Sequence, residues 1–172
     1  MSEEAGKFVL KAPKELLVKL VELNGEDLTE ALKELFSYSG VESKTYERES
    51  YRFDKSELIG DYLIATYGQA CCEWSYIANA LLKQGKGIEV YASCNCYDEC
   101  SYEYYALDEK GTKVAFSLPL ENAGEIVQED EDFIERVSQK AKQWSSMIPE
   151  QVKQGAPEFD EVQLDEFLSY CE

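Results

Sequence analysis

Residues 87–120 read GIEVYASCNCYDECSYEYYALDEKGTKVAFSLPL and decide the fold that we predict for this chain. Apolar and polar side chains alternate from residue 88 to residue 97, which is typical of a strand with two unlike faces. Turn sequences at 98–101 and 108–111 separate two further alternating stretches, and Gly111 suits the left-handed backbone of a tight turn. The stretch therefore predicts a three-stranded antiparallel meander.

Helical periodicity is found on both sides of this meander. Residues 13–24 and 27–40 carry leucine stripes that predict two N-terminal helices forming a hairpin, residues 69–84 predict a central helix, and residues 129–148 predict an amphipathic helix that ends before Pro149. Residues 41–53 and 58–67 are rich in strand-forming side chains, and 1–12 predict a mobile lead with a short strand at 8–10. The natural arrangement is α+β: an antiparallel sheet of about four to five strands with helices packed on one face.

The length favours one domain. We expect residues 1–150 to form a single α+β domain, because 172 residues are enough for one hydrophobic core. Residues 151–172 are expected to be an acidic C-terminal extension, in which Asp160 would cap a short helix.

The charge is the strongest global feature. The chain has 35 acidic and 17 basic residues, a net charge of −18, and residues 121–172 alone hold 14 acidic against 4 basic side chains. Such a field repels nucleic acid and anionic lipid, so a macromolecular partner should be a basic protein. Plain solubility is the alternative explanation of the same charge. The acidic start and the short apolar runs predict neither a signal peptide nor a membrane span, and hence a cytoplasmic protein.

Tyrosines and carboxylates gather along the predicted meander. If the tyrosines lie on an outer sheet face, they form an aromatic surface ringed by acids, which suits a basic partner. The alternative is a sheet covered on both faces, with the tyrosines half-buried. The candidate partner-binding residues are Glu89, Tyr91, Tyr97, Asp98, Glu99, Glu103 and Tyr105.

Cysteines offer a weaker candidate site. Cys94 and Cys96 share a strand face and Cys100 follows closely, but this spacing is not a standard zinc pattern. Without an export signal they are expected to be free thiols, and buried free cysteines behave as small hydrophobic side chains. The absence of histidine excludes catalysis by imidazole. We therefore predict no cofactor.

These observations rank three hypotheses. The first is a non-enzymatic inhibitor or immunity-type protein that covers a basic partner such as a nuclease. In one form of this hypothesis its carboxylates mimic nucleic acid, and a homodimer is compatible with it. The second is a small-ligand or metal-binding domain built on Cys94, Cys96 and Cys100. An enzyme that uses carboxylates ranks last, because no motif pairs two acids around a substrate.

Overall fold

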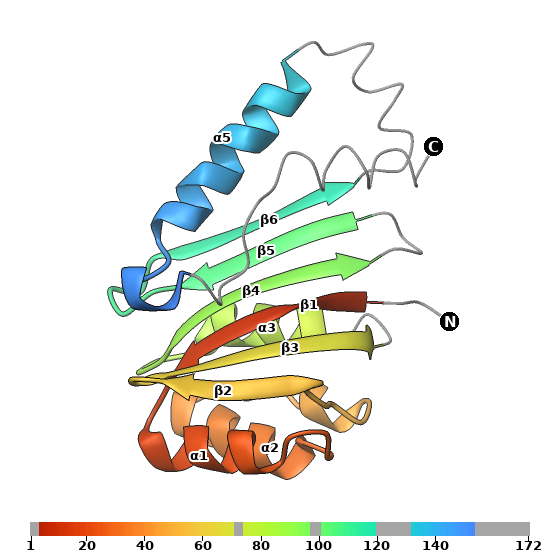
Figure 1. Cartoon of the computed structure of the whole chain (residues 1–172), viewed down its shortest axis with the longest axis vertical. Coiled ribbons are helices and arrows are strands. Elements are labelled where there is room, and N and C mark those ends of the chain that lie inside the picture. The colour runs from red at the N-terminus through yellow and green to blue at the C-terminus, as the bar shows by residue number, and fades with distance from the viewer. Residues whose placement is uncertain (1–3, 71–73, 97–100, 120–131, 154–172) are drawn as a thin grey trace.

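The computed structural model describes residues 4–70, 74–96, 101–119 and 132–153. In this part of the chain a single antiparallel sheet has six strands in the order β2-β3-β1-β4-β5-β6 (Figure 1). The strands are β1 (Glu4–Lys11), β2 (Lys55–Ile59), β3 (Tyr62–Ala70), β4 (Glu89–Cys96), β5 (Ser101–Leu107) and β6 (Lys113–Pro119). The predicted meander of residues 87–120 is confirmed as β4, β5 and β6.

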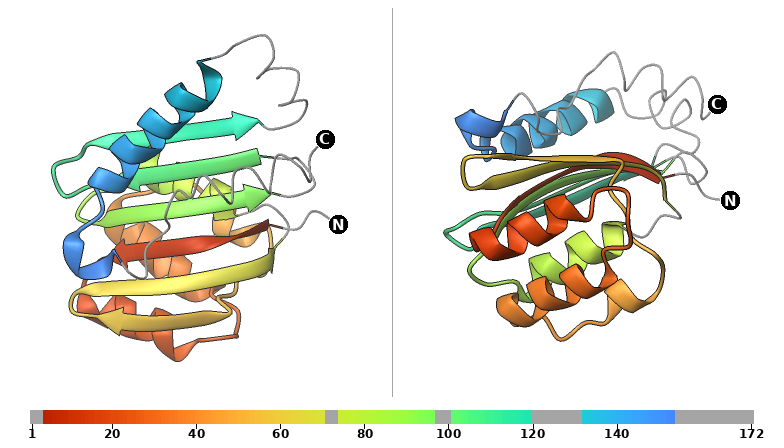
Figure 2. Two further views of the ribbon diagram at one scale, coloured as in Figure 1. Left: turned by 45° about the horizontal axis from the view of Figure 1, so that its top comes forward. Right: turned by 60° about the horizontal axis from the view of Figure 1, so that its bottom comes forward.

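Helices cover both faces of the sheet. The described α-helices are α1 (Lys14–Glu22), α2 (Thr29–Ser39), α3 (Trp74–Gln84) and α5 (Phe133–Ser146), with short 3₁₀ helices η1 (Thr45–Glu47) and η2 (Glu150–Val152). The first three α-helices lie beneath the sheet and α5 lies above it (Figure 2). The prediction that helices pack on one face is therefore wrong. None of the described helices has the length and apolar character that crossing a membrane requires.

The connections form a split βαβ pattern. Strand β1 is followed by α1 and α2, the β2–β3 hairpin, α3 and then β4, and these four strands lie in the order β2-β3-β1-β4. The β5–β6 hairpin extends this unit beyond β4. The helical crossovers from β1 to β2 and from β3 to β4 both lie on the same face of the sheet (Figure 2).

Three segments differ from the sequence prediction. Residues 4–11 were expected to belong to a mobile lead and instead form the central strand β1, which is paired on both sides. Residues 41–53 form η1 and irregular backbone instead of an exposed strand, and Tyr46, Tyr51 and Phe53 from this segment are buried. Residues 55–70 form a two-stranded hairpin around Gly60 and Asp61, whereas the sequence predicts one strand in this region, at 58–67.

The larger core lies between the sheet and α1–α3, and its centre is aromatic. The Trp74 ring stacks on Phe53 with centroids 4.8 Å apart and contacts Phe8 at 5.5 Å. Tyr51 and Tyr67 contact it from two further directions at 5.2 and 5.3 Å. Burial of such rings contributes both transfer free energy and specific ring–ring packing.

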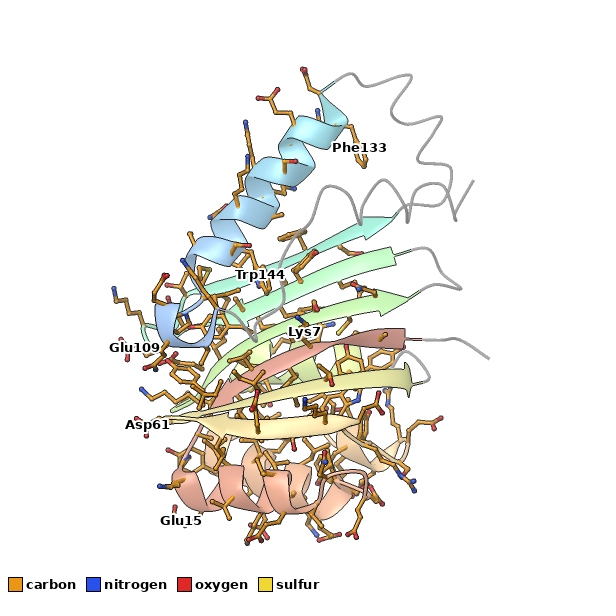
Figure 3. All side chains as sticks on the ribbon, viewed as in Figure 1. Lys7, Glu15, Asp61, Glu109, Phe133 and Trp144 are labelled. Carbon is orange, nitrogen blue, oxygen red and sulfur yellow. The ribbon has the colours of Figure 1, made fainter. Side chains whose placement is uncertain are left out.

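The smaller core lies between the sheet and α5. Trp144 reaches down from α5 toward the strands (Figure 3). Its ring packs against Tyr104 with centroids 4.7 Å apart, and its indole Nε1 donates a hydrogen bond to the Tyr105 carbonyl at 3.0 Å. Ile148 and Val152 extend this cluster across the sheet, so the folded part continues through η2.

Gly6 lies where the backbone of β1 passes too close to β4 and to the Tyr67 hydroxyl to carry a side chain. It sits in β1 opposite Cys94 of β4, beside an irregularity in the β1–β3 pairing. A Cβ atom at this position would lie 1.9 Å from the Ser93 carbonyl oxygen and 2.6 Å from the Tyr67 hydroxyl. Only glycine fits here, since the neighbour that blocks the space is backbone.

Candidate functional site

The buried carboxylate of Glu89 is the centre of a group of polar contacts inside the described structure. Strand register places Lys11 directly opposite both Glu89 of β4 and Tyr62 of β3. Glu89 Oε2 accepts hydrogen bonds from the Tyr62 hydroxyl at 2.6 Å and from the Tyr91 hydroxyl at 3.2 Å. Glu89 Oε1 lies 3.6 Å from Lys11 Nζ, and that ammonium group also lies over the Tyr62 ring. We call these four residues the Glu89 cluster.

The hydrogen bonds and the ion pair of the Glu89 cluster compensate the charge of the Glu89 carboxylate, which would otherwise be costly to bury. Glu89 is only 5% exposed, and a buried carboxylate needs donors to replace the lost water. Burial is the first cause that raises the pKa of Tyr62 and of Tyr91 above the ordinary tyrosine value, and the Glu89 charge adds to it. Both hydroxyls therefore stay protonated at neutral pH and act as donors to the carboxylate.

A cavity of about 500 Å³ adjoins the Glu89 cluster at one end of the sheet. Its walls come from the end of β1 and the next residue, Lys11 and Ala12, from residues 85–89 at the start of β4, and from the β5–β6 hairpin at 107–111. Figure 3 shows Glu109 at the tip of that hairpin. A cavity of this volume lies in the range of small-molecule sites.

The walls of this cavity carry both signs of charge. Lys86 and Lys110 contribute ammonium groups, and neither forms an ion pair within the described residues. Asp108 is used locally, because its Oδ1 accepts from the backbone N–H groups of Lys110 and Thr112. The arrangement offers charged contacts of both signs.

The predicted tyrosine–carboxylate surface is not exposed where the structure describes it. Glu89, Tyr91 and Tyr105 are 5%, 2% and 5% exposed, so the prediction that they lie on an accessible face is wrong. Glu103 is half-buried, and its Oε2 accepts a hydrogen bond from the Tyr105 hydroxyl at 2.9 Å. The remaining candidates, Tyr97, Asp98 and Glu99, lie outside the described residues. Helices on both faces account for the burial, as the alternative interpretation of the sequence had anticipated.

The cysteine candidates are described only at Cys94. Its side chain is buried, and its Sγ lies 2.9 Å from the Tyr67 hydroxyl, which donates to the Ser93 carbonyl. Cys100 and the side chain of Cys96 lie outside the described part of the structure. Within that part, no three side chains of the types His, Cys, Asp and Glu gather as a metal site would require.

Charge is distributed unevenly along the chain. Residues 120–131 and 154–172 together contain 11 acidic and no basic side chains, whereas the rest of the chain contains 24 acidic and 17 basic ones. Residues 154–172 also carry apolar side chains between the acids, at Phe159, Val162, Leu164, Phe167 and Leu168. More than half of the net charge therefore comes from two segments, and the second alternates acidic and apolar residues.

Comparison with known proteins adds no further evidence about the function of this chain. No family model, curated protein or solved structure matches the chain.

Sequence reasoning missed Lys11 and Tyr62 as members of the Glu89 cluster, because nothing in a local pattern indicates that β1 and β3 both border that part of the sheet. The charge of Glu89 within an alternating strand was the one visible signal.

Proposed function

We propose that this protein is a non-enzymatic binding protein that covers a basic protein partner, as an inhibitor or immunity-type protein does. The observation that carries the proposal is the separation of charge: 11 acidic and no basic side chains in residues 120–131 and 154–172. The contact is assigned to these segments, because Glu89, Tyr91 and Tyr105 are buried.

The chemistry of residues 154–172 supports a protein as the partner. Acidic side chains steer a basic molecule and orient it during encounter. The apolar side chains between them supply contact area that a groove can bury. A groove that binds nucleic acid combines positive charge with apolar or aromatic walls, so a nuclease or another nucleic-acid-binding protein fits both features.

The experiment is capture of partners from the source lysate on the immobilised full-length chain, at low and high salt. A variant in which the six acidic residues of 154–172 become the matching amides should lose the captured proteins. The control variant carries six Glu→Gln changes at exposed positions of the domain, namely Glu15, Glu22, Glu26, Glu30, Glu42 and Glu47. Both variants change the net charge equally.

The two variants separate specific contact from bulk charge. Loss of binding in the first variant alone supports the proposal, whereas equal loss in both reduces it to a general charge effect. Capture that persists unchanged at 1 M salt would contradict an electrostatic contact, because the Debye length there is only about 3 Å.

The cavity beside the Glu89 cluster favours a second candidate function. A small molecule with a cationic and an anionic group would match the carboxylates and lysines on its walls. Ligand-observed NMR with a mixture of the common amino acids tests this idea. A hit should weaken in Lys86→Glu and persist in Lys44→Glu, which alters an exposed lysine outside the cavity. The absence of any hit would remove the candidate for this ligand class.

A further inference from the structure

The cavity at the end of the sheet has a buried charge on its wall. Among the side chains that the structure describes, Glu89 is the only charged one that is buried, and it lines this cavity together with Lys11. Every residue on the cavity wall belongs to the described part of the chain. A buried charge that borders a cavity is a natural contact for a ligand of opposite charge.

The two oxygens of the Glu89 carboxylate are used differently. Oε2 accepts hydrogen bonds from the Tyr62 and Tyr91 hydroxyls at 2.6 and 3.2 Å. Oε1 lies 3.6 Å from Lys11 Nζ, which makes an ion pair but is too long for a hydrogen bond. Each carboxylate oxygen has two lone pairs to offer. Within the described residues, Oε1 therefore keeps its capacity to accept hydrogen bonds.

Lys11 shows which kind of group this wall accepts. Its ammonium group lies beside Oε1 of Glu89 and 5.7 Å from the centroid of the Tyr62 ring. The Lys11 side chain is 39% exposed, and an ion pair of a partly solvated lysine contributes little free energy. An external molecule with its own ammonium group can therefore take this position from Lys11.

The charges on the cavity wall favour a cation over an anion. Lys86 and Lys110 are exposed, so water screens any contact that they make with an anionic ligand. Burial raises the pKa of Tyr62, and the negative charges of Glu89 and Glu109 add to that rise. An anion thus meets only solvated ammonium groups, whereas a cation meets a buried carboxylate.

The single open oxygen selects the kind of cation. A guanidinium group binds a carboxylate best through two parallel N–H···O bonds, which require both oxygens. Oε2 of Glu89 already accepts from two hydroxyl groups. A primary ammonium group needs one acceptor, and its compact head can lie over an aromatic ring as that of Lys11 does.

We propose that the cavity binds the primary ammonium group of an external molecule, which displaces Lys11 and donates a hydrogen bond to Glu89 Oε1. A free amine and a lysine side chain of a basic partner both carry this group. The assignment rests on the second candidate function and deepens it, because it names the group that the cavity recognises. Lys86 remains for an anionic group at the other end of the ligand.

Titration of the isotope-labelled full-length protein with n-butylammonium chloride, followed by amide chemical shifts in NMR spectra, tests the assignment. Tetramethylammonium at the same ionic strength is the control, because it carries the same charge and no N–H group. The primary amine should bind about tenfold more tightly and shift the amides of Lys11, Ile88 and Glu89. Equal affinity of the two cations, or shifts confined to other regions, would overturn the assignment.

Two lysine variants of equal charge separate displacement from bulk charge. Lys11→Met removes the internal competitor and should tighten binding of n-butylammonium about fivefold or more. Lys86→Met also removes one positive charge from the cavity wall and should change the affinity by less than about twofold. Equal tightening in both variants, or weaker binding in Lys11→Met, would contradict the proposal.

A charge-removing variant tests the carboxylate itself. Glu89→Gln keeps an oxygen that accepts from the tyrosine hydroxyls, and it should weaken binding of n-butylammonium by more than about tenfold. Unaltered binding in a folded Glu89→Gln protein would contradict the assignment. If this variant does not fold, the two lysine variants still decide.

Further probes distinguish the source of the amine and the level at which the idea fails. A glycine-lysine-glycine peptide with blocked ends that binds as tightly as n-butylammonium would assign the site to a lysine of a protein partner. Exclusion of the peptide would assign it to a free amine. Amino acids that bind while n-butylammonium does not would overturn the ammonium site and leave the second candidate function standing.

Discussion

The two faces of the sheet are packed by different chemistry. Against α1–α3 the sheet presents apolar and aromatic side chains around Trp74, and the contacts there are mainly between rings. Against α5 it presents tyrosines together with the buried Glu89 and the partly exposed Lys11. The face that packs on α1–α3 therefore supplies most of the stability. On the face that packs on α5, the cost of burying the Glu89 charge offsets part of the free energy gained by burial.

The largest effect is expected on the face covered by α1–α3. Trp74→Ala removes a ring that contacts Phe8, Tyr51, Phe53 and Tyr67, and should lower the free energy of unfolding by about 3–5 kcal/mol. Urea denaturation measures this loss, with Trp74→Phe as the milder control. A loss below about 1 kcal/mol would show that this core repacks freely, and would break the comparison.

A smaller loss is expected from the Glu89 cluster. Glu89→Ala leaves the Tyr62 and Tyr91 hydroxyls without their acceptor and should cost about 2–3 kcal/mol. Replacing the carboxylate and both tyrosine hydroxyls together, with Glu89→Leu, Tyr62→Phe and Tyr91→Phe, should restore most of that stability, because neither buried hydroxyl is then left without an acceptor. A triple variant that is less stable than Glu89→Ala would show that the Glu89 cluster does more for stability than satisfy the hydrogen bonds of its own members.

Alkaline titration should detect the buried tyrosine hydroxyls, of which Tyr62 and Tyr91 lie on the α5 face and Tyr105 on the other. The pKa values of Tyr62, Tyr91 and Tyr105 are raised in the folded protein, with burial as the first cause. The folded state thus holds these protons more tightly, so their contribution is fully present below the unfolded tyrosine pKa of about 10 and is lost as pH rises above it. Tyr62→Phe with Tyr91→Phe should flatten the decline of stability measured between pH 9 and 11. An equally steep decline would assign it to other groups.

The smallest effect is expected at Asp27, just before α2 and on the side of the sheet that carries α1–α3. Hydrogen bonds from the Thr29 hydroxyl and N–H lower the pKa of Asp27. Its contribution is therefore present above the unfolded aspartate pKa of about 4 and is lost as pH falls below it. Asp27→Asn should change stability at pH 7 by about 0.5 kcal/mol or less, and should reduce the pH dependence of melting between pH 5 and 3. A dependence unaltered by the substitution would contradict this role.

Local patterns predicted the meander well and the rest of the sheet poorly. The alternation from Ile88 to Cys96 is strong because each side chain meets one of two different environments. In β1 the signal is weak, since Gly6 and Lys7 interrupt the apolar run and the strand is recognised only through its two neighbours. In residues 41–53, ring side chains that favour strands are instead buried from irregular backbone, so tertiary packing overrode propensity.

The candidate site was harder to predict because it depends on which face receives α5. The amphipathic pattern at 129–148 correctly predicted a helix, and Ala141 and Trp144 of α5 are buried against the sheet. Periodicity cannot tell on which side of the sheet such a helix packs. Glu89 and Tyr91 therefore looked like surface residues, although η2 and α5 lie on their face.

The missing side chain at Gly6 makes β1 intolerant of sliding. A shift by one residue would exchange the two faces of the strand, and a shift by two would bring Glu4 or Phe8 to the place where even a methyl group meets the Ser93 carbonyl. The absence of a side chain at Gly6 thus fixes the register of β1 with its neighbours. If β1 paired with β3 and β4 in a shifted register, a side chain would meet the Ser93 carbonyl oxygen where Gly6 now leaves room for it.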